Sequence, residues 1–169
     1  MLTTFRPYFF SFLQALLIFT ALSLLIDWWR QPTQPIQSAN QPLTLLSGEN
    51  ITLAALSRQQ AAVLYFWSSW CGICRYTSPQ IEQLHQTGIP VLSIAMHSGN
   101  ATDVSSHLRQ HHLTLPTVND SDGLISQQWQ VSVTPTIILL KNGQMIHHTS
   151  GFSTYWGLRS RIAAINAWY

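Results

Sequence analysis

Apolar and polar positions divide the chain into three stretches of different character. Residues 8–26 carry no charged side chain, and as a helix they would rise about 28 Å, close to the hydrocarbon thickness of a bilayer. Residues 31–42 are uncharged and rich in glutamine and proline, which is typical of an extended tether. From residue 43 onward, short apolar runs alternate with segments of helical periodicity, and this pattern predicts one globular domain.

These stretches predict a tail over 1–7, a transmembrane anchor over 8–27, a linker over 28–42 and a domain over 43–169. A cleaved signal peptide is the alternative to the anchor. Its apolar region is usually shorter and ends at a small-residue cleavage site, whereas this run continues into Asp27-Trp28-Trp29-Arg30. Two tryptophans suit a membrane interface, so we favour the uncleaved anchor.

Within the domain, the pattern predicts strands that alternate with helices and end in a hairpin with an Asn142-Gly143 turn. Such an order is typical of an α/β sandwich with a mixed sheet. The expected strands are 43–46, 51–53, 62–67, 89–96, 136–140 and 144–149. The expected helices are 71–86, 101–112, 124–129 and 154–167.

The only two cysteines, Cys71 and Cys74, follow the apolar strand 62–67 directly. A helix that begins at Cys71 would direct its first N–H groups and the positive end of its dipole at that sulfur, which favours the thiolate. We therefore expect a pKa for Cys71 below the free-thiol value of about 8.5. Cys74, one turn further, could then attack a mixed disulfide on Cys71 and release the partner.

The same cysteine spacing can form half of a zinc site, but the chain has no second cysteine pair and no histidine pair at zinc-finger spacing. His107 and His111 lie four residues apart on a predicted helix and could chelate copper or zinc. No third ligand is identifiable, and histidines at a helix end also complement its dipole. We therefore predict no metal site and no cofactor.

A second signal follows about sixty residues later, where Pro135 stands at the entrance of an apolar β-branched strand. Proline has no N–H to donate to a sheet, so it belongs at an edge or a tight turn. A cis bond is plausible here, and a trans proline at an ordinary loop–strand junction is the alternative.

Five motifs occur in a fixed order along the domain: Trp70-Cys71-Gly72-Ile73-Cys74-Arg75, Pro79, Val133-Thr134-Pro135-Thr136, Asn142-Gly143 and Gly151. In this order and spacing they resemble the thioredoxin superfamily over roughly residues 41–169. Within it the chain is similar to the membrane-anchored TlpA/DsbE-like branch, in particular to disulfide oxidoreductases of the suppressor-for-copper-sensitivity protein D type. The resemblance implies a thioredoxin-like three-layer sandwich with a mixed central sheet, preceded by one transmembrane helix.

The resemblance also implies roles for individual residues. Cys71 would be the exposed nucleophile, Cys74 the buried resolving thiol, and Pro135 a cis-proline that faces the dithiol. The implied substrate-binding residues are Trp70, Gly72, Ile73 and Thr134.

Two positions depart from the family pattern. Thioredoxins have a buried aspartate where this chain has Tyr65, and reducing relatives of the ResA type have a glutamate where it has Thr77. The proton of Cys74 must therefore pass to water, to the Tyr65 hydroxyl or to another group.

The function that these features predict is thiol–disulfide exchange with exported proteins. The expected location is the inner membrane, with the domain in an oxidising periplasm, and the expected partners are substrate thiols or disulfides, a membrane redox protein and the lipid bilayer. A formal net charge of only +2 gives no reason to expect a nucleic-acid partner. A copper-binding protein that uses the same cysteines and a redox-dependent scaffold are the alternatives.

Overall fold

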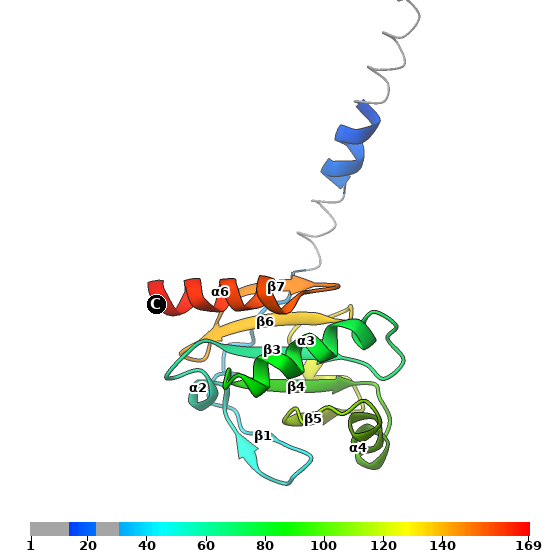
Figure 1. Cartoon of the computed structure of the whole chain (residues 1–169), viewed down its shortest axis with the longest axis vertical. Coiled ribbons are helices and arrows are strands. Elements are labelled where there is room, and N and C mark those ends of the chain that lie inside the picture. The colour runs from blue at the N-terminus through cyan, green and yellow to red at the C-terminus, as the bar shows by residue number, and fades with distance from the viewer. Residues whose placement is uncertain (1–13, 23–30) are drawn as a thin grey trace, which may run out of the picture. The chain divides into compact units, whose positions relative to one another are not determined.

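A computed structural model describes residues 14–22 and 31–169, which divide into a unit up to Gln31 and a unit from Pro32 onward (Figure 1). Residues 14–22 are helical and belong to the predicted anchor, whose other residues, 8–13 and 23–27, lie outside the described ones. Among the helices described, none combines the length and the apolar character that a membrane crossing requires. The anchor over 8–27 therefore stays a prediction.

The centre of the second unit is a five-stranded sheet in the order β5-β4-β3-β6-β7 (Figure 1). The central strand β3 pairs in parallel with β4, and β4 pairs in parallel with β5. Strand β6 runs antiparallel to both β3 and β7. The sheet is mixed, as predicted. Its strands are β3 (Ala62–Trp67), β4 (Val91–Met96), β5 (Thr117–Asp120), β6 (Thr136–Lys141) and β7 (Gln144–Ser150).

All six residues of β3 are buried, because helices cover both faces of the sheet. Successive side chains point to opposite faces. Val63, Tyr65 and Trp67 therefore enter one apolar cluster, while Leu64 and Phe66 enter another.

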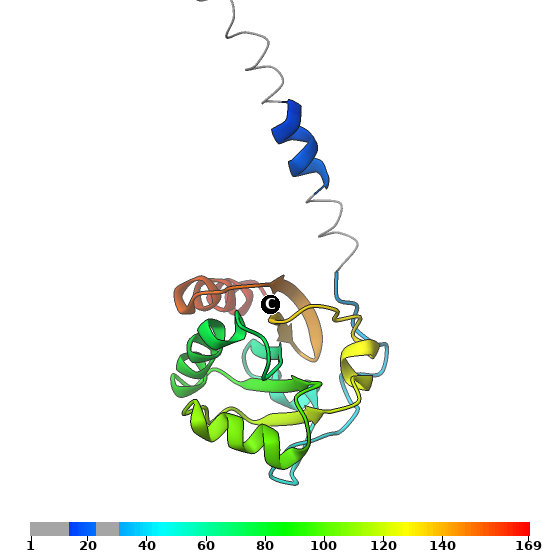
Figure 2. The same cartoon turned by 90° about the vertical axis from the view of Figure 1, so that its right-hand side faces the viewer.

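The first cluster also contains side chains of α3, α4 and α6, and the second is covered by α2 and α5. Figure 2 separates these layers, with α3 and α6 on one side of the sheet and α5 on the other. The predicted sandwich is confirmed. Its helices are α2 (Leu53–Leu56), α3 (Cys74–Gln86), α4 (Ala101–Gln110), α5 (Leu124–Gln128) and α6 (Tyr155–Trp168).

Four elements differ from the sequence-based expectation. The strands β1 (Leu43–Thr44) and β2 (Asn50–Ile51) are only two residues long, and the short helix α2 follows them. Strand β5 was not predicted, because Thr-Val-Asn-Asp has no apolar alternation. It forms because it pairs with β4. Its last residue also caps the next helix, since the buried Asp120 carboxylate accepts hydrogen bonds from the N–H groups of Ile125 and Ser126, both at 2.9 Å.

The predicted tether does not hold for residues 32–42, which pack against the domain. The Gln34 side chain donates to the carbonyl of Gly143 and accepts the N–H of Met145, both at 2.6 Å, in the β6–β7 hairpin. The Thr33 N–H donates to the carbonyl of Trp129 at 2.9 Å. Composition alone cannot predict these contacts, because a polar, proline-rich segment does not indicate that the Gln34 side chain will hydrogen-bond to the backbone of Gly143 and Met145 rather than to solvent.

Candidate active site

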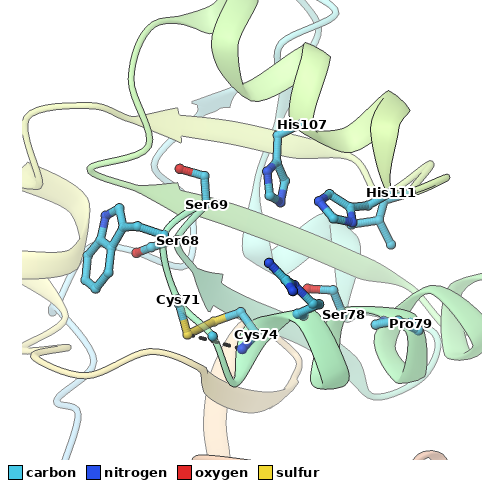
Figure 3. Close-up of a pocket in the computed structure, with 12 residues that line it drawn as sticks. Ser68, Ser69, Cys71, Cys74, Ser78, Pro79, His107 and His111 are labelled. Atoms are coloured by element: carbon cyan, nitrogen blue, oxygen red, sulfur yellow. Dashed lines mark hydrogen bonds between the residues drawn. A yellow bond between two sulfur atoms is a disulfide. The ribbon is translucent and has the colours of Figure 1, made fainter.

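The two cysteines lie where β3 passes into α3, and they form a disulfide with their Cα atoms 5.3 Å apart (Figure 3). Cys71 is partly exposed, whereas Cys74 is only 3% exposed and belongs to the core cluster. A partner can therefore reach the first sulfur and not the second.

The amino terminus of α3 is directed at the Cys71 sulfur. The helix begins at Cys74, three residues later than predicted, because Gly72 and Ile73 form a turn. No side chain caps this helix; instead the Cys74 backbone N–H donates to Cys71 Sγ at 3.2 Å. The predicted contact between the helix amides and this sulfur is confirmed.

The loop before β6 lies against the same sulfur. The Thr134–Pro135 peptide bond is cis, as the resemblance implied, and the Thr134 carbonyl oxygen is 3.4 Å from Cys71 Sγ. The Gly151 N–H donates to the Pro135 carbonyl at 2.8 Å and ties this loop to the end of β7. Residues more than sixty positions apart in the chain thus meet at one atom.

The predicted substrate-binding residues surround Cys71. Gly72 is exposed, and the Trp70 and Ile73 side chains are 67% and 50% exposed, which is unusual for large apolar groups. The Trp70 indole N–H donates to the His97 carbonyl at 3.1 Å, so the ring is held beside the disulfide.

Neither position that departs from the family pattern offers a proton acceptor. Tyr65 is fully buried, and its hydroxyl forms a 2.9 Å hydrogen bond with Ser78 Oγ. Burial raises the pKa of Tyr65 far above its ordinary value of 10, so the hydroxyl keeps its proton. The buried Thr77 hydroxyl donates to the Ile73 carbonyl at 3.3 Å.

A pocket of about 100 Å³ opens beside the disulfide, and α4 forms its far wall (Figure 3). The His107 ring stacks on Trp67 with centroids 5.1 Å apart, and the His111 ring lies 4.4 Å from His107. The pocket is lined by Ser68, Ser69, Trp70, Cys71, Gly72, Cys74, Arg75, Ser78, Pro79, His107, His111 and Leu113.

The sequence placed His107 and His111 on one helix face but did not connect that face with the dithiol. Their proximity depends on the crossover from β4 through α4 to β5, which lays α4 beside the end of β3. Burial lowers the pKa of His107, and repulsion from His111 and Arg75 lowers it further.

We expect the domain to lose stability as the pH falls through about 6.5, the ordinary histidine value. Burial is the main cause that lowers the pKa of His107, His147 and His148 in the folded chain. Below pH 6.5 the unfolded chain therefore binds more protons than the folded one. The free energy of unfolding is thus greatest above that pH, and it declines as the pH falls towards the lower pKa values that the histidines have in the folded chain. Urea midpoints at pH 7.5 and 5.5 measure the change.

A His147→Gln, His148→Gln double variant should show a weaker decline, because both sites then no longer titrate. A midpoint that stays constant or rises on acidification would contradict this expectation.

The protein-family model described as "AhpC/TSA family" matches residues 34–149. A thioredoxin-like protein of Haemophilus influenzae is 40% identical over 150 residues, 89% of this chain and 90% of that protein. The sporulation thiol-disulfide oxidoreductase A of Bacillus subtilis is 26% identical over 145 residues, 79% of this chain and 87% of the relative.

The crystal structure of StoA from Bacillus subtilis superposes with a TM-score of 0.62 at 24% sequence identity. The match covers 71% of this chain and 93% of that structure. The likeness shows that the sandwich described above has the thioredoxin-like fold.

Proposed function

Since the chain belongs to the AhpC/TSA family and is a thioredoxin-like protein disulfide oxidoreductase, we propose that it exchanges disulfides with exported proteins through Cys71 and Cys74. One observation carries the proposal. The accessible sulfur of Cys71 lies between the Cys74 N–H and the cis-proline loop, while the second sulfur is buried behind it.

The exchange has two steps when the chain reduces a substrate. The Cys71 thiolate attacks a substrate disulfide, so that a mixed disulfide forms and one substrate sulfur leaves as a thiolate. The Cys74 thiolate then attacks Cys71 Sγ, the mixed disulfide breaks, and the second substrate sulfur leaves. Two electrons pass from the dithiol to the substrate, and the reverse sequence oxidises a substrate dithiol.

The surroundings of Cys71 support a polypeptide as the substrate. The exposed Trp70 and Ile73 side chains, which flank Cys71 in the sequence, offer apolar contacts to a substrate. The backbone at Thr134 lies beside Cys71, where it can hydrogen-bond an extended substrate segment next to the attacked cysteine.

We further propose that the domain works in the periplasm on an inner-membrane anchor, as a TlpA/DsbE-like protein of the suppressor-for-copper-sensitivity protein D type. The uncharged run 8–26 and the dithiol support this placement, because a disulfide-exchanging protein suits an oxidising compartment. A redox protein of the same membrane would then restore the dithiol.

Thiol labelling tests this placement. In cells whose outer membrane is permeabilised, a membrane-impermeant maleimide should label Cys71 of the reduced chain, and the protein should sediment with membranes at full length. Labelling only after lysis of the inner membrane, or a native amino terminus between residues 20 and 40, would contradict the proposal.

No observation in the described residues favours the copper-binding alternative. Over residues 14–22 and 31–169, no three side chains of histidine, cysteine, aspartate or glutamate are grouped so that they could hold one metal ion.

A further inference from the structure

We propose that His107 accepts the proton that Cys74 loses when it becomes the resolving thiolate. The inference rests on the proposed function, because it assigns a proton acceptor to the second step of the exchange. That acceptor is needed because Tyr65 and Thr77 replace the family's acidic residues. The Tyr65 hydroxyl keeps its proton in a hydrogen bond with Ser78, and the Thr77 hydroxyl donates to the Ile73 carbonyl.

The pocket beside the disulfide connects the two residues. Cys74 is almost wholly buried, yet it lines this pocket together with His107 (Figure 3). A volume of about 100 Å³ exceeds what one water molecule requires, so a short chain of water can pass a proton between the sulfur and the imidazole.

No carboxylate in this pocket competes for the proton, and His111, the other imidazole that lines it, is exposed whereas His107 is half-buried against Trp67. No aspartate or glutamate is among the lining residues, which include three serines. Asp103 lies one turn before His107 on α4, but its carboxylate accepts the Asn100 N–H at 3.0 Å in the capping box of that helix.

The surroundings of His107 favour the neutral form of its ring, which can accept a proton. Arg75 from α3 and His111 at the carboxyl-terminal cap of α4 are the ionisable groups that face it besides the two cysteines, and the Trp67 ring covers one face. Burial lowers the pKa of His107 most, and repulsion from His111 and Arg75 lowers it further, which favours the neutral imidazole. The Arg75 charge also favours the thiolate that forms.

The step balances without any further reactant. The Cys74 proton passes through pocket water to a ring nitrogen of His107, and the Cys74 thiolate attacks Cys71 Sγ. The Cys71–Cys74 bond forms as the bond between Cys71 and the substrate breaks, and the substrate sulfur leaves as a thiolate. The imidazolium then returns its proton to the solvent or to that thiolate.

Reaction of the reduced full chain with the aromatic disulfide DTNB separates the two steps in a stopped-flow experiment. The first thionitrobenzoate is released when Cys71 attacks the reagent, and the second when Cys74 attacks the mixed disulfide. In His107→Gln the second release at pH 7 should be slower by about 100-fold and the first unchanged within about twofold, since loss of a general base costs 10²–10⁴.

Further variants distinguish proton transfer from a structural role. His107→Phe keeps a ring over Trp67 without a proton acceptor and should show the same loss, whereas Tyr65→Phe should keep the wild-type rate. The wild-type second step should follow the ionisation of a histidine with pH, and both His107 variants should lose that inflection. Added imidazole should restore the rate in His107→Ala.

A second release at the wild-type rate in His107→Gln and His107→Phe, with the first release intact, would overturn the inference and leave the proposed function standing. Equal slowing of both releases would also overturn it, because that result indicates a distorted site. A wild-type chain that releases no second thionitrobenzoate would overturn the proposed function itself.

Discussion

Replacing Cys74 by alanine is expected to trap the full chain in a mixed disulfide with a substrate protein, whereas Cys71→Ala should trap none. Of the two cysteines only Cys71 is accessible, and its sulfur accepts a hydrogen bond from the Cys74 N–H at the amino terminus of α3. Without Cys74, nothing attacks the mixed disulfide from within, so the complex should persist for as long as other thiols are absent. The measurement is non-reducing electrophoresis with mass analysis after incubation of each reduced variant with oxidised insulin.

The two variants are matched, because each retains one cysteine of the same pair. Trapping should differ by at least about tenfold, since Cys74 is buried and lacks the amide contact that favours a thiolate. Equal trapping by both variants, or trapping by Cys71→Ala alone, would contradict the assignment of Cys71 as the nucleophile.

Trp67→Ala is expected to lower the free energy of unfolding by about 3–5 kcal/mol, which is the usual cost of removing a fully buried tryptophan. The Trp67 side chain is 1% exposed, and its indole N–H donates to Ser93 Oγ at 3.2 Å. It also supports the His107 ring at the wall of the pocket. Urea denaturation of the oxidised full chain measures the change.

Trp168→Ala is the matched control, because the same side chain is removed from a position that is 85% exposed. Its effect should stay within about 0.5 kcal/mol, as for most surface substitutions. If both variants lost the same stability, the burial of Trp67 in the core would not be the cause.

The sequence predicted those elements whose local pattern agrees with their final environment. Strand 62–67 is continuously apolar because both its faces are covered, and its predicted bounds are those of β3. Strand β5 could not be predicted in this way, because its stability comes from its pairing with β4 and from the use of Asp120 as a helix cap. The β4 residues that pair with β5 lie 24 positions earlier in the chain, as Ser93 does from Thr117, and neither this pairing nor the Asp120 cap leaves a periodic pattern.

The dithiol itself was evident from spacing, because Cys71 and Cys74 lie within one helical turn. The position of α4 beside this dithiol was not evident from the sequence, because the proximity of His107 to the disulfide depends on where a crossover helix packs. A sequence pattern shows which residues share a helix face but not which element that face meets.

The most direct test of the central claim is catalytic reduction of insulin disulfides by the full chain with dithiothreitol as the electron donor. The wild-type chain should accelerate the reduction over many turnovers, and a Cys71→Ser, Cys74→Ser variant should leave it at the rate of dithiothreitol alone. If the wild-type chain and this variant gave the same rate, the Cys71–Cys74 pair would not exchange disulfides with proteins.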